Sequence, residues 1–209
     1  MAILLSSYND AVISRWAGLL GGHFQTVEAR SLEAIRAKCS AVKFEMILLH
    51  RHLVDMAAFV KLRELFPAAR FFIMSDSPDE EEALSFLKLG IVGYANTYIS
   101  PPLLLEALRV VLDGRVWLGQ AIIQRLIQET AAGANRDKGG AARTALAALT
   151  KTERMIADRV AQGGSNLEIA AEFKITKRTV KAHLTSIYEK TKTGNRLNLA
   201  LLINMGTKH

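Results

Sequence analysis

The sequence predicts an α/β fold followed by a smaller all-α domain. Two observations predict the first part: short apolar runs recur through the first 118 residues, and amphipathic segments with helical spacing lie between them. This alternation is typical of a parallel sheet covered by helices on both faces. A third observation predicts the second part, because the apolar residues after about residue 147 recur with helical spacing.

The candidate strands are runs of four to six residues, which is the length expected for buried parallel strands. They are AILLS (2–6), FQTVEA (24–29), EMILL (45–49), RFFIM (70–74) and VGYAN (92–96). Each is followed by a helical segment, so five β-α repeats are predicted. The helical segments are DAVISRWAGLL (10–20), LEAIRAKC (32–39), LVDMAAFVKLRELF (53–66), DEEEALSFLKL (79–89) and PLLLEALRVVLDG (102–114).

Local signals predict where some of these helices begin and end. Ser77-Pro78-Asp79-Glu80 predicts an N-cap serine followed by a proline at the first helical position, and Ser100-Pro101 repeats this arrangement. Gly90 and Gly114 are predicted to end the helices that precede them.

The domain boundary is predicted from a change in composition. A further helix over about 119–131 leads into AAGANRDKGGAARTA, which lacks apolar periodicity and is rich in small residues. We therefore predict a first domain over 1–131, a linker over 132–147 and a second domain over 148–209.

The basic excess lies almost entirely in the second domain. Residues 1–148 hold 16 Lys and Arg against 15 Asp and Glu, a net charge of +1, whereas residues 149–209 hold 11 against 5, a net charge of +6. This asymmetry indicates a polyanionic partner for the second domain. A solvated basic surface is the alternative interpretation.

Composition excludes several classes of protein. No apolar run approaches the ~20 residues that span a bilayer, so no membrane association is expected. The start MAILLSSYND lacks a basic region and is interpreted as a strand, not a signal peptide. The single cysteine, Cys39, excludes an internal disulfide and favours the cytoplasm. No catalytic constellation is present, so we expect neither an enzyme nor a cofactor.

Capping signals predict the helices of the second domain. Thr150-x-x-Glu153 and Ser165-x-x-Glu168 are capping boxes, each at the start of an apolar-periodic run. Gly163-Gly164 ends the first helix, and Thr176 can cap a third over about 177–191. On this third helix one face carries Val180, Leu184, Ile187 and Tyr188, and the other carries Lys177, Lys181, Thr185 and Lys192. Two short helices joined by Lys174-Ile175-Thr176, the second with a basic outer face, make a helix-turn-helix.

The segment TKTERMIADRVAQGGSNLEIAAEFKITKRTVKAHLTSIYEKTKTGNR closely resembles the LuxR-type DNA-binding domain of NarL/FixJ response regulators. The matching positions are Glu153, Gly163, Asn166, Glu168-Ile169-Ala170, Ile175, Thr179-Val180-Lys181, His183-Leu184 and Asn195-Arg196. The resemblance implies that the helix at 177–191 enters the major groove of double-stranded DNA. It also implies that the five β-α repeats form a receiver-like (flavodoxin-like) domain.

The resemblance assigns roles to three sets of residues. Lys181, Ala182 and Thr185 lie where base edges are read. Contacts to phosphates are implied for Lys177, Arg178, Thr179, His183, Lys190, Lys192 and Arg196. The last helix, Asn195 to Asn204, implies a homodimer through Leu197, Leu199, Leu201 and Leu202, although packing within its own domain would explain part of this apolar stripe.

The receiver-like domain departs from the family's phosphorylation site. That site needs an acidic pair after the first strand, an aspartate ending the third strand and a lysine ending the fifth. Ser7 and Tyr8 replace the acidic pair, His50 replaces the aspartate and Thr97 replaces the lysine. The resemblance therefore implies a pseudo-receiver, a receiver fold without aspartyl-phosphate chemistry.

Other residues of this domain leave alternatives open. Ser75 and Tyr94 match the family's switch residues, and each also has a purely structural reading as a strand-end hydroxyl and a half-buried ring. His50 and His52 on an extended segment would place both rings on one side, a geometry that can bind zinc or copper. The sequence identifies no third ligand, so no metal is assigned, and His50 is expected to be hydrogen-bonded in the pocket.

The sequence thus predicts a DNA-binding transcriptional regulator that works without aspartyl phosphorylation, with a protein or small-molecule signal at the pseudo-receiver. The alternative is an adaptor that does not bind DNA and uses the pseudo-receiver to bind a signalling partner. The basic outer face of the helix at 177–191 favours the first hypothesis.

Overall fold

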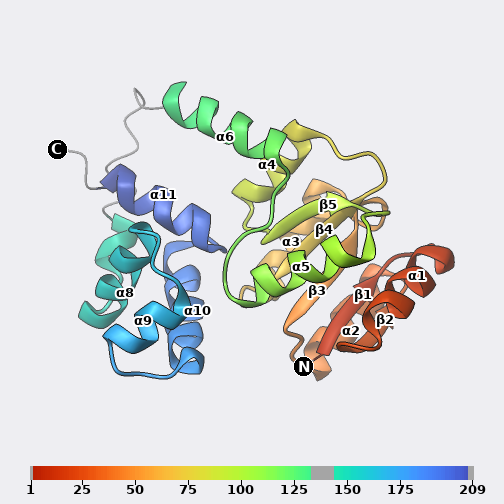
Figure 1. Cartoon of the computed structure of the whole chain (residues 1–209), viewed down its shortest axis with the longest axis horizontal. Helices are drawn as coiled ribbons and strands as arrows, with labels where there is room; N and C mark the ends of the chain where they lie inside the picture. Colours follow the sequence, from red (N-terminus) through yellow and green to blue (C-terminus); the bar gives the residue numbers. More distant parts are fainter. Residues whose placement is uncertain (1, 133–143, 207–209) are drawn as a thin grey trace.

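A computed structural model of the chain describes residues 2–132 and 144–206. Its first domain contains the predicted five-stranded, all-parallel sheet, and the strands lie in the order β2-β1-β3-β4-β5 (Figure 1). The strands are β1 (Ala2–Ser6), β2 (Gln25–Ala29), β3 (Met46–His50), β4 (Phe71–Ser75) and β5 (Gly93–Asn96). Because all strands run in one direction, the residues that follow them meet at a single edge of the sheet.

Helices cover both faces of the sheet. They are α1 (Asp10–Leu20), α2 (Leu32–Ala41), α3 (Met56–Leu65), α4 (Glu80–Lys88) and α5 (Pro101–Leu112). One core joins α2, α3 and α4 to strand residues such as Leu4, Ile47 and Ile73, and the other joins α1 and α5 to their neighbours Ile3, Leu48 and Phe72. The two sets alternate along the strands because successive side chains point to opposite faces.

Two local predictions in this domain are wrong. Asp79, not Ser77, is the N-cap of α4: its side chain accepts a hydrogen bond from the Glu82 backbone N–H, and the helix begins at Glu80. The helix predicted over 53–66 begins only at Met56, because a 3-10 helix, η1 (Arg51–Leu53), turns the chain first. Ser100 occupies the predicted N-cap position of α5, although its side chain makes no capping hydrogen bond there. Gly90 and Gly114 follow their helices as predicted, at positive φ (91° and 89°).

The helix α6 (Gln120–Ala132) ends the first described segment. The predicted linker over 132–147 lies mainly outside the described residues, and its last part, 144–147, is helical. There Leu146 packs into the core of the second domain.

The second domain consists of α8 (Lys151–Ala161), α9 (Asn166–Glu172), α10 (Lys177–Thr191) and α11 (Arg196–Gly206). Both predicted capping boxes are present at Thr150 and Ser165. Its core is formed by residues from all four helices, among them Ile156, Ile169, Val180, Leu184 and Leu199.

The two domains are docked against each other through hydrogen bonds from side chains of one domain to backbone carbonyls of the other (Figure 1). The Arg63 guanidinium donates to the Gly194 carbonyl oxygen (3.0 Å) and to that of Ala69 (2.6 Å). From the other side, the Asn195 side-chain amide donates to the Ile91 carbonyl oxygen (2.8 Å), and that of Asn198 donates to Leu87 (2.8 Å).

Between these hydrogen bonds the backbones touch at two glycines. A Cβ added to Gly90 would lie 2.9 Å from the Gly194 Cα, and a Cβ added to Gly194 would lie 2.9 Å from the Gly90 Cα. The close approach therefore requires glycine on both sides.

None of the helices in the described part of the chain combines the length and the apolar character needed to cross a bilayer.

Candidate functional site

A polar pocket lies at the edge of the sheet where the strands end. His50, the last residue of β3, is only 1% exposed, and both of its ring nitrogens have partners. Nδ1 lies 2.9 Å from the Ser7 hydroxyl oxygen, and Nε2 lies 3.0 Å from an Asp76 carboxylate oxygen. His50 is thus buried and hydrogen-bonded, as expected. Its partners come from the two neighbouring strands: Ser7 follows β1 and Asp76 follows β4.

The remaining residues of the predicted degenerate site surround His50 without bonding to it. The indole N–H of Trp16 donates to the Thr97 carbonyl oxygen (3.2 Å), and the indole ring meets His50 edge-on at 6.0 Å between ring centroids. Thr97 is buried, whereas Tyr8 is exposed, with its ring 6.1 Å from that of His50. Asp10 lies in the first turn of α1 and pairs with Arg30 outside the pocket.

Sequence reasoning missed Asp76, which brings a carboxylate into this pocket. It follows β4 directly, so the register of the parallel sheet could have placed it beside His50. Burial raises the pKa of the Asp76 carboxyl, but the nearby hydroxyl of Thr97 and the hydrogen bond with His50 outweigh burial and leave the pKa below its ordinary value. The Thr97 hydroxyl itself has no well-formed hydrogen bond among the described residues.

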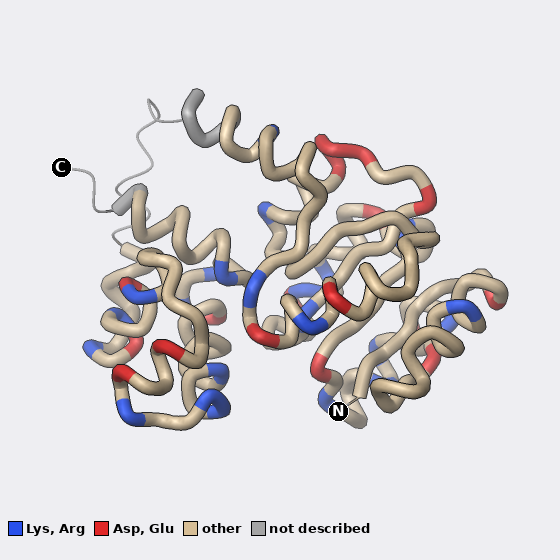
Figure 2. Tube along the Cα trace, viewed as in Figure 1, with Lys and Arg blue, Asp and Glu red and all other residues tan. Residues whose placement is uncertain are grey.

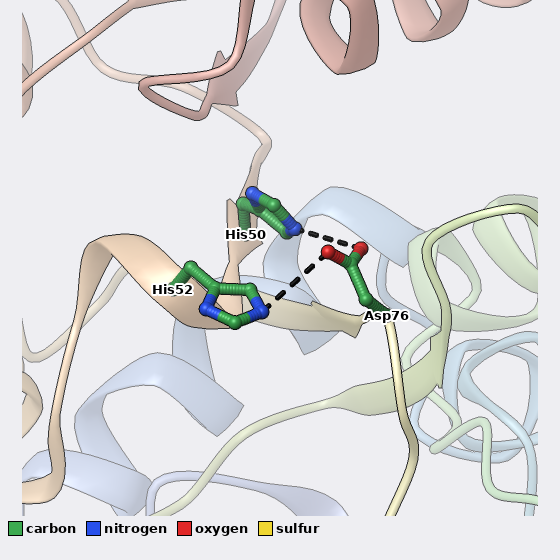
Figure 3. A group of neighbouring side chains, drawn as sticks. All are labelled: His50, His52 and Asp76. Atoms are coloured by element: carbon green, nitrogen blue, oxygen red, sulfur yellow. Dashed lines mark hydrogen bonds and ion pairs between the residues drawn. The ribbon is translucent and has the colours of Figure 1, made fainter.

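His52 also turns toward Asp76, with Nε2 3.5 Å from the second carboxylate oxygen (Figure 3). The predicted extended segment is wrong, because His52 lies in η1. The tight turn nevertheless brings the two imidazole rings within 5.3 Å of each other, measured between centroids.

The two residues that match switch positions are buried. The Tyr94 hydroxyl donates to a Glu82 carboxylate oxygen (2.9 Å) and accepts from the Asp79 backbone N–H (3.3 Å). The other Glu82 oxygen accepts from the Arg51 guanidinium (2.6 Å). Ser75 lies at the end of β4, 4% exposed. In this structure Tyr94 is held inward by the bonds that its hydroxyl makes to α4.

A second candidate site is the outer face of α10. The Thr176 hydroxyl caps this helix by accepting from the Thr179 backbone N–H (3.1 Å), and Lys174 turns the chain before it at φ 54°. Lys177, Arg178 and Ala182 are exposed on its first two turns, and Thr179 and His183 are half-buried. Figure 2 shows basic positions gathered around the turn from α9 to α10.

Two of the residues predicted to contact phosphate are engaged inside the domain. The Lys190 ammonium binds both carboxylate oxygens of buried Glu153 (2.9 and 2.7 Å). The Arg196 guanidinium donates to the Gly164 carbonyl oxygen and, at 3.4 Å, to the Asn166 side chain. Both basic groups therefore have structural partners that the sequence did not indicate. Lys192 is exposed and ends α10 in a left-handed conformation, at φ 57°.

The face of α10 that carries Lys181 and Thr185 is turned toward the first domain. Both residues line a pocket with Arg70 and Arg115 of that domain. Burial, and then the charge of Arg70, lower the pKa of Lys181, while Glu45 and Asp113 oppose this effect. In the docked arrangement both side chains are half-buried against the first domain.

The apolar stripe of α11 is used mainly inside the chain. Leu199 is fully buried in the second domain's core, and Leu202 packs against that core. Leu197 packs against a core of the first domain. The prediction that Leu199 mediates a subunit contact is therefore wrong, because it has no surface to offer a second chain. Leu201 is half-buried and stays a candidate.

The fold and these two sites define a class of protein: one in which a receiver-like α/β domain precedes a helix-turn-helix domain. The family model "Bacterial regulatory proteins, luxR family" matches residues 147–203. This segment of the chain belongs to the luxR family of bacterial regulatory proteins, and the chain as a whole is similar to proteins named as response regulators.

Individual proteins are similar to this chain over most of its length. The nitrate/nitrite response regulator protein NarL of Escherichia coli (strain K12) is 32% identical to this chain over 147 residues. The match covers 69% of this chain and 64% of NarL, which is slightly less than two thirds of the length of NarL. The glycerol metabolism activator of Pseudomonas putida is 29% identical over 160 residues, 75% of this chain and 72% of that protein. The two-component response regulator RcsB, in a complex with DNA, has the same fold over 100% of this chain and 99% of its own, with a TM-score of 0.55 at 14% identity.

Proposed function

We propose that this chain is a transcriptional regulator that binds double-stranded DNA through α10 and works without aspartyl phosphorylation. The observation that carries the DNA-binding part is the scaffold of α9 and α10, which presents exposed Lys177, Arg178 and Ala182 beside Lys181 and Thr185. A helix of this kind fits the major groove, where lysine donates to guanine acceptors and alanine contacts the thymine methyl group.

Of the residues predicted to contact phosphates, only the exposed ones are proposed to do so. Lys177, Arg178 and Lys192 are free to meet a duplex backbone, whereas Lys190 neutralises Glu153 and Arg196 holds the backbone of Gly164. Phosphate contacts position the helix and carry no sequence information.

The docked arrangement adds a condition to DNA binding. Because Lys181 and Thr185 face the first domain, the two domains have to separate before both residues can read bases. The apparent affinity for DNA then equals the intrinsic affinity reduced by the fraction of open molecules. A signal that binds the first domain would act by changing that fraction.

The observation that supports phosphorylation independence is the environment of His50. The position that would hold a phosphoacceptor carries an imidazole bonded to Ser7 and Asp76, and the acidic pair is replaced by Ser7 and Tyr8. A pocket with one carboxylate lacks the set of oxygen ligands that Mg²⁺ prefers. Incubation with acetyl phosphate and Mg²⁺ should therefore leave the intact mass of the protein unchanged. Addition of a phosphoryl group that Asp76→Asn abolishes would refute this part of the proposal.

The DNA-binding part is tested by substitution of Lys181. Lys181→Ala should weaken binding to a selected duplex by about 1–3 kcal/mol and relax the preference for that sequence. Lys151→Ala is the matched control, since Lys151 is an exposed lysine of the same domain on α8. Equal affinities for both variants, or no binding of the wild type to any duplex, would favour the adaptor hypothesis.

A further inference from the structure

Three potential metal ligands converge at the edge of the sheet. His50 Nε2, His52 Nε2 and the Asp76 carboxylate all lie within 4.8 Å of one another, and no other three histidine, cysteine or acidic side chains form such a group within 2–132 and 144–206. Figure 3 shows both imidazole rings pointing a nitrogen at the same carboxylate. The ligands come from the end of β3, from η1 and from the residue after β4.

We propose that His50, His52 and Asp76 form a binding site for a divalent transition-metal ion of the zinc class. Two imidazoles and one carboxylate are a ligand set typical of zinc, with a fourth position left for water or another ligand. Imidazole also suits copper, nickel and iron, whereas Mg²⁺ and Ca²⁺ prefer oxygen ligands. Cys39, whose thiol pKa is raised by burial to about 11, lies on α2 and is not part of the group.

The spacing of the ligand atoms is close to what a tetrahedral ion needs. Zinc–ligand bonds of about 2.0–2.1 Å place ligand atoms about 3.4 Å apart. His50 Nε2 and His52 Nε2 lie 3.0 and 3.5 Å from the two different oxygens of Asp76, and the three ligand atoms lie within 4.8 Å of one another. A small movement of the two partly exposed ligands, His52 (54% exposed) and Asp76 (35% exposed), would bring all three around one ion.

The surroundings of His50 are already those of a metal ligand. The Ser7 hydroxyl, itself buried, lies 2.9 Å from Nδ1 and fixes the ring so that Nε2 faces Asp76. When Nε2 binds a metal, Nδ1 carries the ring proton and donates it to Ser7, which is the outer contact that metal-binding histidines usually have.

Without a metal, Ser7, His50 and Asp76 form hydrogen bonds with the same heavy atoms. In that state the Ser7 hydroxyl donates to Nδ1 and Nε2–H donates to Asp76, since the histidine is then the other neutral tautomer. The Ser7 oxygen accepts from the Asn9 backbone N–H in either state. An ion would thus take the place of the hydrogen atom between His50 and Asp76; the ring keeps one proton, now on Nδ1, and the Ser7 hydroxyl turns from donor to acceptor of that bond.

The site is accessible from solvent and would join two segments of the chain. His50 is buried, but Asp76 is 35% exposed, so an ion can enter from the side of His52. A bound ion would fasten η1 to the loop after β4. This inference goes beyond the proposed DNA binding and holds whether or not α10 contacts a duplex.

The test is a titration of untagged, full-length protein stripped of metal, with Zn²⁺ followed by calorimetry and Co²⁺ followed by visible absorbance. We expect one ion per chain, and intense visible bands of tetrahedral Co²⁺. Ser7→Ala should weaken binding about 10- to 100-fold. His52→Ala and Asp76→Asn should weaken it more than Ser7→Ala does, because each removes a ligand.

His23→Ala provides the matched control, since His23 is an exposed histidine outside the group. It should bind Zn²⁺ as the wild type does. Because His52 and Asp76 are both partly exposed, their variants should keep the fold, which circular dichroism checks. The proposal is overturned if the wild type binds no ion at equimolar Zn²⁺, or if His52→Ala and Asp76→Asn bind as tightly as His23→Ala.

Discussion

Gly90→Ala should separate the two domains, because it places a methyl group where their backbones touch. The added Cβ would lie 2.9 Å from the Gly194 Cα and 3.3 Å from the Thr193 carbonyl oxygen. Backbone atoms cannot rotate away as a side chain can, so the contact is relieved only when the domains move apart. That movement breaks the bonds of Asn195 and Asn198 to the carbonyls of Ile91 and Leu87.

The size of the effect has two parts. Alanine at φ 91° is strained locally by roughly 1–2 kcal/mol, and this part destabilises the fold of the first domain. The steric part is specific to the docked arrangement and should cost about 1–3 kcal/mol, as overpacking does in protein interiors. Converted to an equilibrium constant, it raises the ratio of open to docked molecules by about 5- to 150-fold.

Gly163→Ala separates the two parts. Like Gly90, Gly163 follows a helix, donates its N–H to the carbonyl three residues earlier and has a positive φ, of 87°. A Cβ added there meets nothing within 4 Å. Gly163→Ala should therefore carry the strain alone, and it should destabilise the second domain without opening the chain.

Small-angle scattering measures the outcome. The radius of gyration should rise for Gly90→Ala and stay at the wild-type value for Gly163→Ala, and duplex affinity should rise for Gly90→Ala alone if opening exposes Lys181. Equal radii for the wild type and Gly90→Ala would refute the reasoning, because the glycine contact would then not hold the domains in the docked arrangement in solution.

The remaining predictions concern stability and assembly. Hydrogen bonds from Lys190, the Thr150 backbone and Ser186 outweigh burial and lower the pKa of Glu153 from 4.5 to about 2, so its ionised form stabilises the second domain by up to about 3 kcal/mol above pH 4.5. This contribution should be lost as the pH falls from about 4.5 toward 2, and acid titration of Glu153→Gln should show a flatter profile over that range. If half-buried Leu201 contributes to a homodimer, Leu201→Glu should weaken self-association measured by sedimentation. The control Asn204→Glu, at an exposed position on α11, should leave self-association unchanged. Unchanged association in both variants would place the subunit contact elsewhere.

The sequence predicted most elements of the fold because their signals are local. The apolar strands and the helix over 10–20 follow from spacing alone, and the capping boxes at Thr150 and Ser165 need only residues three positions apart. Ser77 was mistaken for the cap of α4 because Asp79 competes with it two residues later, and only the backbone shows which side chain reaches an N–H.

The pocket was predicted only in part, because its composition depends on the register between strands and not on local signals. Ser7, His50 and Thr97 follow or end strands that the sequence revealed, and they do meet. No local signal marks Asp76, because its role depends on the pairing of β3 with β4, which places it beside His50. Leu199 was misjudged because an apolar stripe on a helix looks the same whether it faces its own core or a second chain.

The docking contacts bear on whether domains of such regulators can be exchanged. Asn195 and Asn198 donate to carbonyl oxygens of the first domain, and Arg63 donates to one of the second. Because the acceptors are backbone atoms, many different side chains are tolerated at the acceptor positions. The glycine contact is different, because it fails if either partner carries a Cβ. A chimera that joins this second domain to another receiver would therefore need glycine at the position of Gly90, and an arginine at that of Arg63, before it could adopt the same closed arrangement.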